Sequence, residues 1–375
     1  MAKAVRLADV ARAAGVSQGT ASNVFSRPEI VRPEVRLRVE ESARRLGYAG
    51  PDPKGRLLRA GKVNAIGVVV MDDLTYFFSD PFNREFMRGV AGVCDQRGAG
   101  LALVSALDRA KAAWTINSAV VDGFIVQCIE GGDRLLELTR KRGLPFVVVD
   151  IDPGPGANSI VIDDRAGARL AAEHLLALGH RRFGILSLEI AGDGVTGPVD
   201  RTRRASAQYG ATRDRLLGYQ DAFAAASALP WWREQFGGYE EALAAAGIDI
   251  DDLPIIEALN DRRGAAAGAK ALLDRAPEVT AVLAMSDVLA LAVLDEARSR
   301  RLGVPTDLSV VGYDDVPEAA AAIPPLTTIA QPIEEKGRLA AQMIFDGGPP
   351  RREMLPVKLV VRGTTAAPRQ NSPAR

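Results

Sequence analysis

Apolar residues near the start of the chain follow a helical spacing that ends at a glycine. They recur at i, i+3, i+4 and i+7, as Leu7, Val10, Ala11 and Ala14, and this spacing places one apolar stripe on a short helix. Gly15 comes next, where a glycine can adopt a positive φ and end the helix. The pattern therefore predicts a short helix that stops in a tight turn.

A second helix is expected directly after this turn. Ser17 precedes it and can cap it by accepting a hydrogen bond from the main-chain N–H of Thr20. Its apolar residues Ala21, Val24 and Phe25 would face inward. The outer face would be small and rich in amides, which fits a DNA major groove. We therefore expect DNA contacts from Ser17, Gln18, Gly19, Thr20, Ser22 and Asn23.

A third helix is expected from Pro33, because proline suits the first turn of a helix and apolar residues continue at helical spacing up to Gly47. Arg32 before it is a poor N-cap. Residues 49–62 then combine two prolines, three glycines and four positive charges, a composition typical of a connector.

From Val63 onward, short β-rich runs alternate with amphipathic helical stretches. The expected strands are Ala65–Met71, Leu101–Ala106, Gly123–Cys128, Pro145–Asp150, Ile160–Asp163, Phe183–Leu188, Ile255–Leu259, Ala281–Met285 and Leu308–Tyr313. The expected helices are Asn83–Gln96, Asp133–Arg142, Ala166–Leu178, Arg262–Arg275 and Asp287–Arg300. This alternation indicates parallel sheets with helices on both faces. Because so many strands do not fit one compact sheet of this kind, we expect an α/β body of two doubly wound parallel-sheet subdomains, with a ligand cleft at the carboxyl ends of their strands.

Charge is distributed unevenly along the chain. Residues 1–62 hold 13 Lys and Arg against 6 Asp and Glu, whereas the remainder holds 34 against 41. A basic head on an acidic body is expected when only the head must meet a polyanion. An ordinary helical cap is the alternative interpretation of the head.

Other protein classes have less support in the sequence. It has no apolar run long enough for a membrane span and no signal peptide, so we expect a cytoplasmic protein. Cys94 and Cys128 are expected to be inert core thiols, with a redox switch as the alternative. His174 and His180 lack the spacing of a metal pair. We expect no metal and no cofactor.

Two features between residues 187 and 247 are harder to interpret. Gly192–Gly197 matches the pattern G-x-G-x-x-G, but a polar, arginine-rich stretch follows it in place of an apolar helix, which disfavours nucleotide binding. A near repeat begins at Gly218 and again at Gly238. We interpret it as two helices, one of which is an insertion.

Together these segments resemble the lactose-repressor/galactose-repressor (LacI/GalR) family of bacterial transcription regulators over nearly the whole chain. Asp9–Ser17, with Thr20 and Ser22, is similar to the helix-turn-helix of the family, and Arg56–Gly61 is similar to its hinge. The stretches similar to its body are Arg165–Ala168, Glu173–Arg181, Ser309–Asp315 and Pro324–Pro332. The resemblance implies a body like that of periplasmic sugar-binding proteins, a homodimer, and a small effector in the cleft.

The resemblance also implies a domain organisation, with chain crossings between subdomains near Asp164, Gly312 and Ile333. We expect a helix-turn-helix DNA-binding domain at 1–48, a hinge at 49–62, a body at 63–362 and a flexible tail at 363–375. Within the body, the N-subdomain would comprise about 63–163 and 312–333, and the C-subdomain about 164–311 and 334–362.

Candidates for the effector site come from the resemblance and from their place in the pattern. Arg215 matches the effector-contacting arginine of the family, with Arg233 as a rival because of the near repeat. Asp287 is implied as a pocket residue but could also cap a helix. Asp150 ends a strand, where it could accept hydrogen bonds from sugar hydroxyls or have only a structural role. The other candidates are Tyr76 and Phe82, which could stack on a ring, and Asn260, which stands where an aromatic residue is common.

The chain departs from the family pattern at both expected sites. Asn23 stands where arginine is common, and Gly19 has no side chain with which to read a base. Extra residues, 73–79, precede Pro81. The operator and the effector therefore cannot be copied from a relative.

The resemblance gives the hinge a role on DNA. In the family the hinge becomes a helix when it meets DNA and inserts a leucine into the minor groove at the operator centre. We therefore expect Arg56 and Leu58 to contact DNA. A leucine that packs on the body is the alternative.

The sequence thus predicts a ligand-responsive, sequence-specific DNA-binding regulator, a repressor, that binds operator DNA as a homodimer. Its effector would be a small polar molecule, a carbohydrate. Neither enzymatic activity nor membrane association is expected. The alternatives are a sugar-binding protein without a transcriptional role, which would need a signal peptide in place of the basic head, and a nucleotide-dependent enzyme, which would need a better phosphate loop.

Overall fold

The computed structural model divides the chain into two units, one up to Val63 and one from Asn64 onward. It describes residues 5–50, 62–71, 73–108, 110–127, 133–151, 153–154, 156–228 and 248–369. No helix within these ranges is both long and apolar enough to cross a bilayer.

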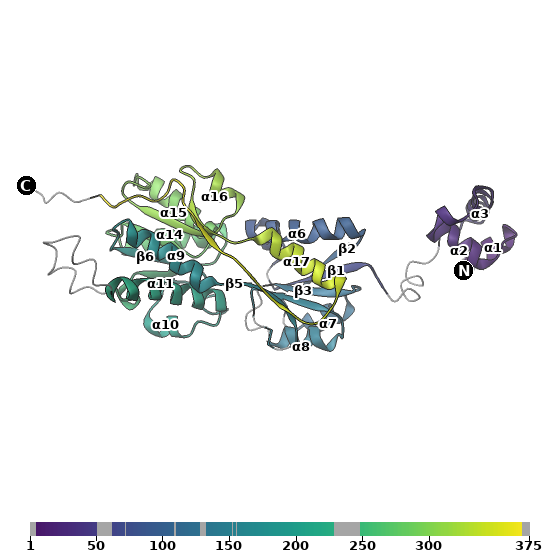
Figure 1. Ribbon diagram of the computed structural model, residues 1–375, viewed down its shortest axis with the longest axis horizontal. Coiled ribbons are helices and arrows are strands. Elements are labelled where there is room, and N and C mark those ends of the chain that lie inside the picture. The colour runs from purple at the N-terminus through teal and green to yellow at the C-terminus, as the bar shows by residue number, and fades with distance from the viewer. Residues whose placement is uncertain are drawn as a thin grey trace, which may run out of the picture. The chain divides into compact units, whose positions relative to one another are not determined.

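In the first unit, the described residues form three α-helices, as the apolar spacing predicted (Figure 1). They are α1 (Leu7–Ala13), α2 (Gln18–Ser26) and α3 (Pro33–Leu46), with a short 3-10 turn at Pro28–Ile30. Gly15 has a φ of +64° in the turn between α1 and α2. The core of this unit is built from small buried side chains: Val10, Ala11, Ala14, Ala21, Val24, Val39 and Ala43.

The described residues of the second unit form two sheets, and we call each sheet with its covering helices a lobe. The first-lobe sheet has the strand order β12-β5-β4-β3-β1-β2, and its paired strands are all parallel. The strands are β1 (Ala65–Val70), β2 (Gly100–Ser105), β3 (Gly123–Gln127), β4 (Phe146–Val149), β5 (Asn158–Ile162) and β12 (Arg352–Leu355). One face is covered by α6 (Pro81–Arg97) and α17 (Ile333–Asp346), and the other by α7 (Ala112–Ser118) and α8 (Asp133–Lys141) (Figure 1).

The second-lobe sheet has the order β13-β11-β10-β9-β6-β8-β7. Its central strands are parallel, and the edge strands β13 and β7 are antiparallel to their neighbours. The strands are β6 (Phe183–Ser187), β7 (Gly197–Pro198), β8 (Ile255–Glu257), β9 (Ala281–Ala284), β10 (Ser309–Asp314), β11 (Thr327–Ala330) and β13 (Lys358–Val360). The covering helices are α9 (Asp164–Ala177) with α11 (Gly210–Ala228), and α14 (Arg262–Arg275) with α15 (Asp287–Ser299). The predicted pair of doubly wound sheets is therefore confirmed.

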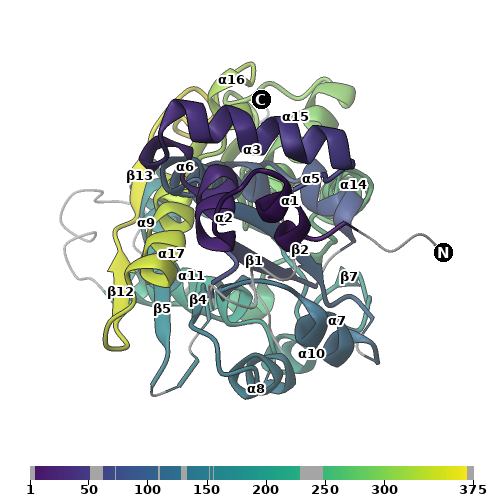
Figure 2. The same ribbon diagram turned by 90° about the vertical axis from the view of Figure 1, so that its right-hand side faces the viewer.

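α6 and α17 lie side by side over the first-lobe sheet (Figure 2). They approach closely because Gly89 faces the main chain of Glu334 and Gly337 faces that of Phe86, and neither glycine has room for a Cβ atom. This packing ties a late segment of the chain to the first lobe.

The course of the chain between the lobes differs from the expectation. The crossing expected near Gly312 is wrong, because β10 continues to Asp314 in the second sheet and β11 pairs with it in parallel. The strands within 312–333, which were expected in the N-subdomain, therefore belong to the second lobe. α17, expected in the C-subdomain, packs on the first lobe. The pairing of β11 with β10 determines this assignment, because hydrogen-bonded neighbours belong to the same sheet.

Residues 363–369, expected in a flexible tail, are instead anchored to the second lobe. Thr364 is buried, and its main-chain oxygen accepts a hydrogen bond from the N–H of Val310 at 2.8 Å. His180 Nε2 lies 2.8 Å from the oxygen of Ala366, and His174 Nε2 lies 3.0 Å from Thr365 Oγ1. Burial lowers the pKa of both histidines. The two histidines therefore hold the C-terminal segment in place.

Candidate functional site

The outer face of α2 is small and polar. Ser17 caps the helix, because its Oγ accepts a hydrogen bond from the N–H of Thr20 at 3.0 Å. Ala21 and Val24 are buried in the core of the first unit. Of the residues expected to contact DNA, the exposed ones are Ser17, Gln18 and Gly19, and the half-buried ones are Thr20, Ser22 and Asn23. This face can present amide and hydroxyl groups to a major groove.

A cavity of about 270 Å³ lies between the two lobes, at the carboxyl ends of their strands. Ligands bind at this edge in sheets of this kind. Its walls come from both lobes. The lining residues are Val70, Met71, Tyr76, Phe77, Asp80, Phe82, Asn83, Gln127 and Asp150 from the first lobe, Asp164, Leu188, Glu189, Tyr209, Ala211, Thr212, Arg215, Asn260, Ser286 and Asp314 from the second, and Gln331 at the crossing after β11.

Arg215 on α11 is held in one orientation by its surroundings. Its side chain is buried, and Nε donates a hydrogen bond to Asp164 Oδ1 at 2.7 Å. Nη1 donates to the main-chain oxygen of Met285. The guanidinium also lies 3.6 Å from the centroid of the Tyr313 ring. A fixed guanidinium of this kind can present its remaining N–H groups to a ligand without reorganising.

Lys336 on α17 neutralises the carboxylate of Asp150, which lines the cavity. It is fully buried, its Nζ donates to Asp150 Oδ1 at 2.6 Å, and it also donates to Gln331 Oε1. Gln331 in turn donates through Nε2 to Asp314 Oδ1 at 2.6 Å. These hydrogen bonds link the two lobes through the crossing after β11.

The backbone and the pKa values of two of these carboxylates are perturbed. Asp150 has a φ of +60° and Asp314 a φ of +120°, conformations that cost energy in residues with a side chain and that cluster at functional sites. Burial raises the pKa of Asp150, although Lys336 opposes the shift. Burial raises the pKa of Asp314 to about 7, against the opposing effect of Arg215.

Gln127, at the end of β3, carries an unsatisfied acceptor. Its Nε2 donates to Asn83 Oδ1 at 2.9 Å. Its Oε1 is buried and has no hydrogen-bond partner among the described residues. Leaving such an acceptor unpaired costs about 1–3 kcal/mol. A ligand hydroxyl that donates to Gln127 Oε1 would remove this cost and so favour binding.

Tyr76 and Asn260 form a contact between the lobes along the cavity wall. Tyr76 belongs to the short helix α5 (Leu74–Ser79) of the first lobe, and its hydroxyl donates to the main-chain oxygen of Asn260 at 3.1 Å. The Oδ1 atom of Asn260 accepts from Ser286 Oγ at 2.6 Å. Two residues expected at the effector site thus contact each other across the lobes.

Comparisons with known proteins agree with both units. Residues 6–50 match the family described as bacterial regulatory proteins, lacI family, and residues 172–365 match the periplasmic binding protein-like domain. The chain is 38% identical over 370 residues to an HTH-type transcriptional regulator of Mycobacterium tuberculosis, covering 96% of this chain and 97% of that protein. This chain belongs to the lacI family.

Solved structures of lacI-family regulators share its fold. The lac repressor dimer bound to operator and the anti-inducer ONPF matches with a TM-score of 0.70 and 25% identity, covering 97% of this chain and 100% of that one. The complex of the transcriptional regulator CelR with cellobiose matches with a TM-score of 0.65 and 27% identity, covering 96% and 99%. As a lacI-family member, this chain is a ligand-responsive DNA-binding transcriptional regulator.

The residues expected at the effector site of this lacI-family member divide into two groups. The cavity wall contains Tyr76, Phe82, Asp150, Arg215 and Asn260. Asp287 is different: it is fully buried, and its carboxylate accepts from Thr328 Oγ1 at 2.6 Å and from the N–H of Val316 at 2.9 Å. Its expected place on the cavity wall is wrong, because Ser286 caps α15 and Asp287 turns toward the adjoining strand and loop.

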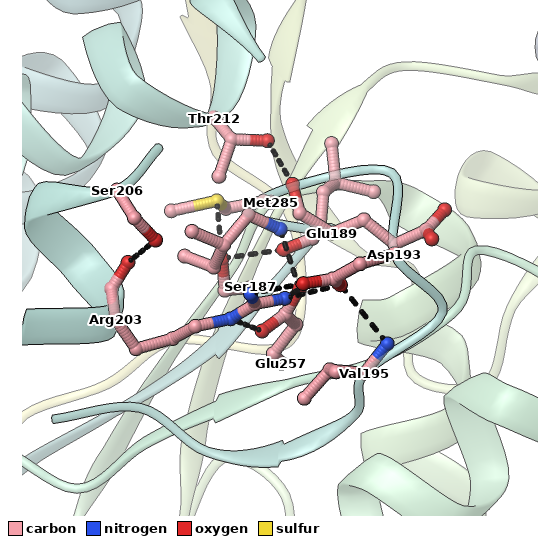
Figure 3. Close-up of polar contacts among 11 residues, drawn as sticks. Ser187, Glu189, Asp193, Val195, Arg203, Ser206, Thr212, Glu257 and Met285 are labelled. Atoms are coloured by element: carbon pink, nitrogen blue, oxygen red, sulfur yellow. Dashed lines mark hydrogen bonds and ion pairs between the residues drawn. The ribbon is translucent and has the colours of Figure 1, made fainter. Parts of the chain in front are cut away.

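Arg203 on α10 (Arg201–Ala205) joins the loop after β6 to β8 (Figure 3). Its Nε and Nη2 donate to the two oxygens of Glu257 at 2.8 Å, and its Nη1 and Nη2 donate to Asp193 at 2.6 and 2.8 Å. Glu257 is buried and also accepts from the N–H of Ile190 at 2.6 Å. This ion-pair cluster fixes the loop that forms one side of the cavity.

The stretch Gly192–Gly197 lies in the same loop. It leads into the short strand β7. A pyrophosphate-binding turn needs a helix N-terminus directly after its glycines. The resemblance of this stretch to a nucleotide-binding motif therefore has no structural support.

Sequence reasoning missed several cavity residues, among them Asn83, Gln127, Asp164, Asp314 and Gln331. Gln127 and Asp314 end buried strands, and the same signal that singled out Asp150 could have found them. Other candidates lie outside the described residues: Arg56, Leu58, Arg233 and Cys128.

Asp314→Asn is expected to remove part of the pH dependence of stability. A carboxylate whose folded pKa is raised stabilises the fold below its unfolded pKa, near 3.8, and this contribution is lost as pH rises through about 7. The variant should therefore gain stability relative to the unmodified protein as pH increases over this window. Melting temperatures measured at several pH values would show this, and a constant difference between the two proteins would contradict it.

Proposed function

We propose that this lacI-family regulator binds operator DNA as a homodimer, with α2 of each protomer in a major groove. The observation that carries this proposal is that α2 buries its apolar residues in the core of the first unit and leaves a polar face at the surface. Gln18 would read a base edge through its amide, and Ser17, Gly19, Thr20, Ser22 and Asn23 would complete the contact surface. The similar lac repressor was solved as a dimer bound to operator. Residues 1–48 would be the DNA-binding domain.

The connector, 49–62, would act as the hinge. Its residues 51–61 lie outside the described ranges, so the roles of Arg56 and Leu58 rest on the sequence. Its positive charges suit a segment beside phosphates. Leu58 would enter the minor groove when the hinge folds on DNA.

Gln18→Ala is expected to relax base preference at one position of each half-site. A bidentate amide–base contact provides about 1–3 kcal/mol of discrimination against the wrong base, and Gly19 beside it cannot replace the contact. Binding to a set of operators with single-base changes would measure this. Affinity for non-specific duplex serves as the control, because it should not change. An unaltered preference would assign base reading to Ser22 and Asn23.

We further propose that the effector is a small, neutral, polyhydroxylated molecule, a sugar. The observation that carries this proposal is that Arg215 on the cavity wall and the buried Lys336 beside Asp150 are each already paired with a carboxylate. An anionic ligand would therefore find the charge of both cations already neutralised. Hydroxyl groups can instead donate to the carboxylates and to Gln127. The similar regulator CelR was solved with cellobiose.

A thermal-shift screen of sugars, sugar phosphates and nucleotides tests this proposal. A ligand present at 100 times its Kd stabilises a protein by about 2.7 kcal/mol. At least one neutral sugar should raise the melting temperature, and its phosphate should not. Stabilisation only by phosphorylated ligands or nucleotides would overturn the proposal.

The site supports a binding protein in preference to an enzyme. The similar proteins are transcriptional regulators, and each charged group described above has a binding or structural role. Because its target is chromosomal DNA, we assign it to the cytoplasm. A sugar-binding protein without a transcriptional role would leave the basic three-helix unit unexplained.

A further inference from the structure

The helix α5 (Leu74–Ser79) is firmly attached to the first lobe. Asp73 caps it, because its Oδ1 accepts a hydrogen bond from the N–H of Thr75 at 2.7 Å. Phe77 is buried and packs in the hydrophobic core. The position of Tyr76 on this helix is therefore set by the first lobe.

Asn260 is positioned independently by the second lobe. It follows β8, and the Ser286 hydroxyl that caps α15 also donates to its Oδ1 at 2.6 Å. Its main-chain oxygen accepts the Tyr76 hydroxyl at 3.1 Å, and its Nδ2 lies 3.4 Å from that same hydroxyl. The contact between Tyr76 and Asn260 can therefore form only when the two lobes are close together.

A second contact between the lobes starts from the same segment. Arg84, in the first turn of α6, donates to the main-chain oxygen of Ser79 at 2.7 Å and pairs with Glu318. Glu318 belongs to α16 (Pro317–Ala321), which follows β10 of the second lobe. Both side chains of the ion pair are well exposed, so the pair adds little energy by itself. The Tyr76 contact is the one that lines the cavity.

We propose that Tyr76 and Asn260 form a latch between the lobes that closes the cavity over a single-ring sugar and excludes a two-ring sugar. The nature of the ligand rests on the proposed function, whereas the latch itself does not. The cavity, about 270 Å³, is smaller than the usual range of about 300–1,000 Å³ for ligand pockets. A longer ligand would force the lobes apart and break the latch.

Tyr76 also provides an aromatic surface on the cavity wall. Its ring lines the cavity from the first lobe. A ring in this wall can pack against the apolar face of a sugar. The Tyr76 side chain therefore couples stacking on the sugar, through its ring, to closure of the two lobes, through its hydroxyl.

Hydrogen exchange of the full-length, ligand-free protein tests the latch. Tyr76→Phe keeps the ring and removes the hydroxyl. Exchange should increase both in peptides that contain α5 and in peptides that contain Asn260, which lies on the other lobe. Phe78→Leu, a change at an exposed position of the same helix, is the matched control and should leave the Asn260 peptides unchanged. If Tyr76→Phe alters exchange only within α5, the residue has a local role and the latch is overturned.

Titration calorimetry with D-ribose, D-glucose and cellobiose tests the size limit. A single-ring sugar that binds the unmodified protein should bind Tyr76→Phe about 3- to 10-fold more weakly, the loss expected for one hydrogen bond, and should bind Phe78→Leu normally. Cellobiose binding to the unmodified protein as tightly as the single-ring sugars would overturn the size limit. If none of the three sugars binds, the size limit is overturned, while the thermal-shift screen decides the proposed sugar effector and the exchange experiment decides the latch.

Discussion

Replacing Arg203 by alanine is expected to lower the free energy of unfolding by about 3–5 kcal/mol, the cost of breaking a buried ion pair by removing one partner. The side chain of Arg203 is 18% exposed and that of Glu257 only 1%. Without Arg203, the Glu257 carboxylate would keep only the N–H of Ile190 among its hydrogen bonds described above. The variant would leave a nearly bare charge inside the second lobe.

Arg201→Ala is the matched control for this prediction. Arg201 lies on the same short helix, its side chain is 84% exposed, and it lies 3.5 Å from Asp251. An exposed pair of this kind contributes about 0–1 kcal/mol. Chemical denaturation of both variants would measure the difference. Adding Glu257→Gln to Arg203→Ala should recover part of the loss, because a neutral amide is less costly to bury. Equal effects of Arg203→Ala and Arg201→Ala would contradict the account.

Deletion of residues 1–62 is expected to abolish operator binding. Specific binding is typically at least about 1,000-fold tighter than non-specific binding, and the deletion removes the whole α2 surface together with 13 of the positively charged residues. The remaining chain has an excess of acidic residues, 41 against 34 basic ones, which opposes contact with phosphates.

Fluorescence anisotropy with a labelled operator would measure the effect of this deletion. The control is the thermal response of the truncated body to a sugar that stabilises the full-length protein, because both lobes begin after Val63. A truncated body that still binds operator specifically would show that the DNA contacts lie elsewhere.

Regular periodicity made much of the fold predictable. The helices of the first unit and all nine expected strand segments are present, since their apolar spacing extends over several residues. The late elements had weaker signals. β11, β12 and β13 are three or four residues long and each includes polar residues, whereas β4 and β9, of similar length, are apolar throughout. α17 contains Gly337, and a glycine disfavours a helix in isolation. A glycine is needed at this position because the main chain of α6 packs against it.

The cavity was predictable where a polar residue ends a buried strand, as for Asp150. Contacts between the lobes were not predictable from the sequence, because they depend on how the two sheets face each other. The hydrogen bond between Tyr76 and Asn260 joins residues 184 positions apart. Asp287 shows the opposite case. The family resemblance suggested a pocket residue, but its carboxylate accepts from Thr328 and Val316, because only packing decides which way a first-turn side chain points.

The central claim is that a ligand in the cavity controls the α2 surface. The most direct test is titration of the full-length protein on labelled operator with the sugar that stabilises it, beside the variant Arg215→Lys. The lysine retains a charge for Asp164 but loses the planar fork that orients a ligand. We predict that the sugar changes the operator affinity of the unmodified protein by about 5- to 150-fold, and that the Arg215→Lys variant binds operator but no longer responds to the sugar. A sugar that binds the cavity and leaves operator affinity unchanged would contradict the central claim.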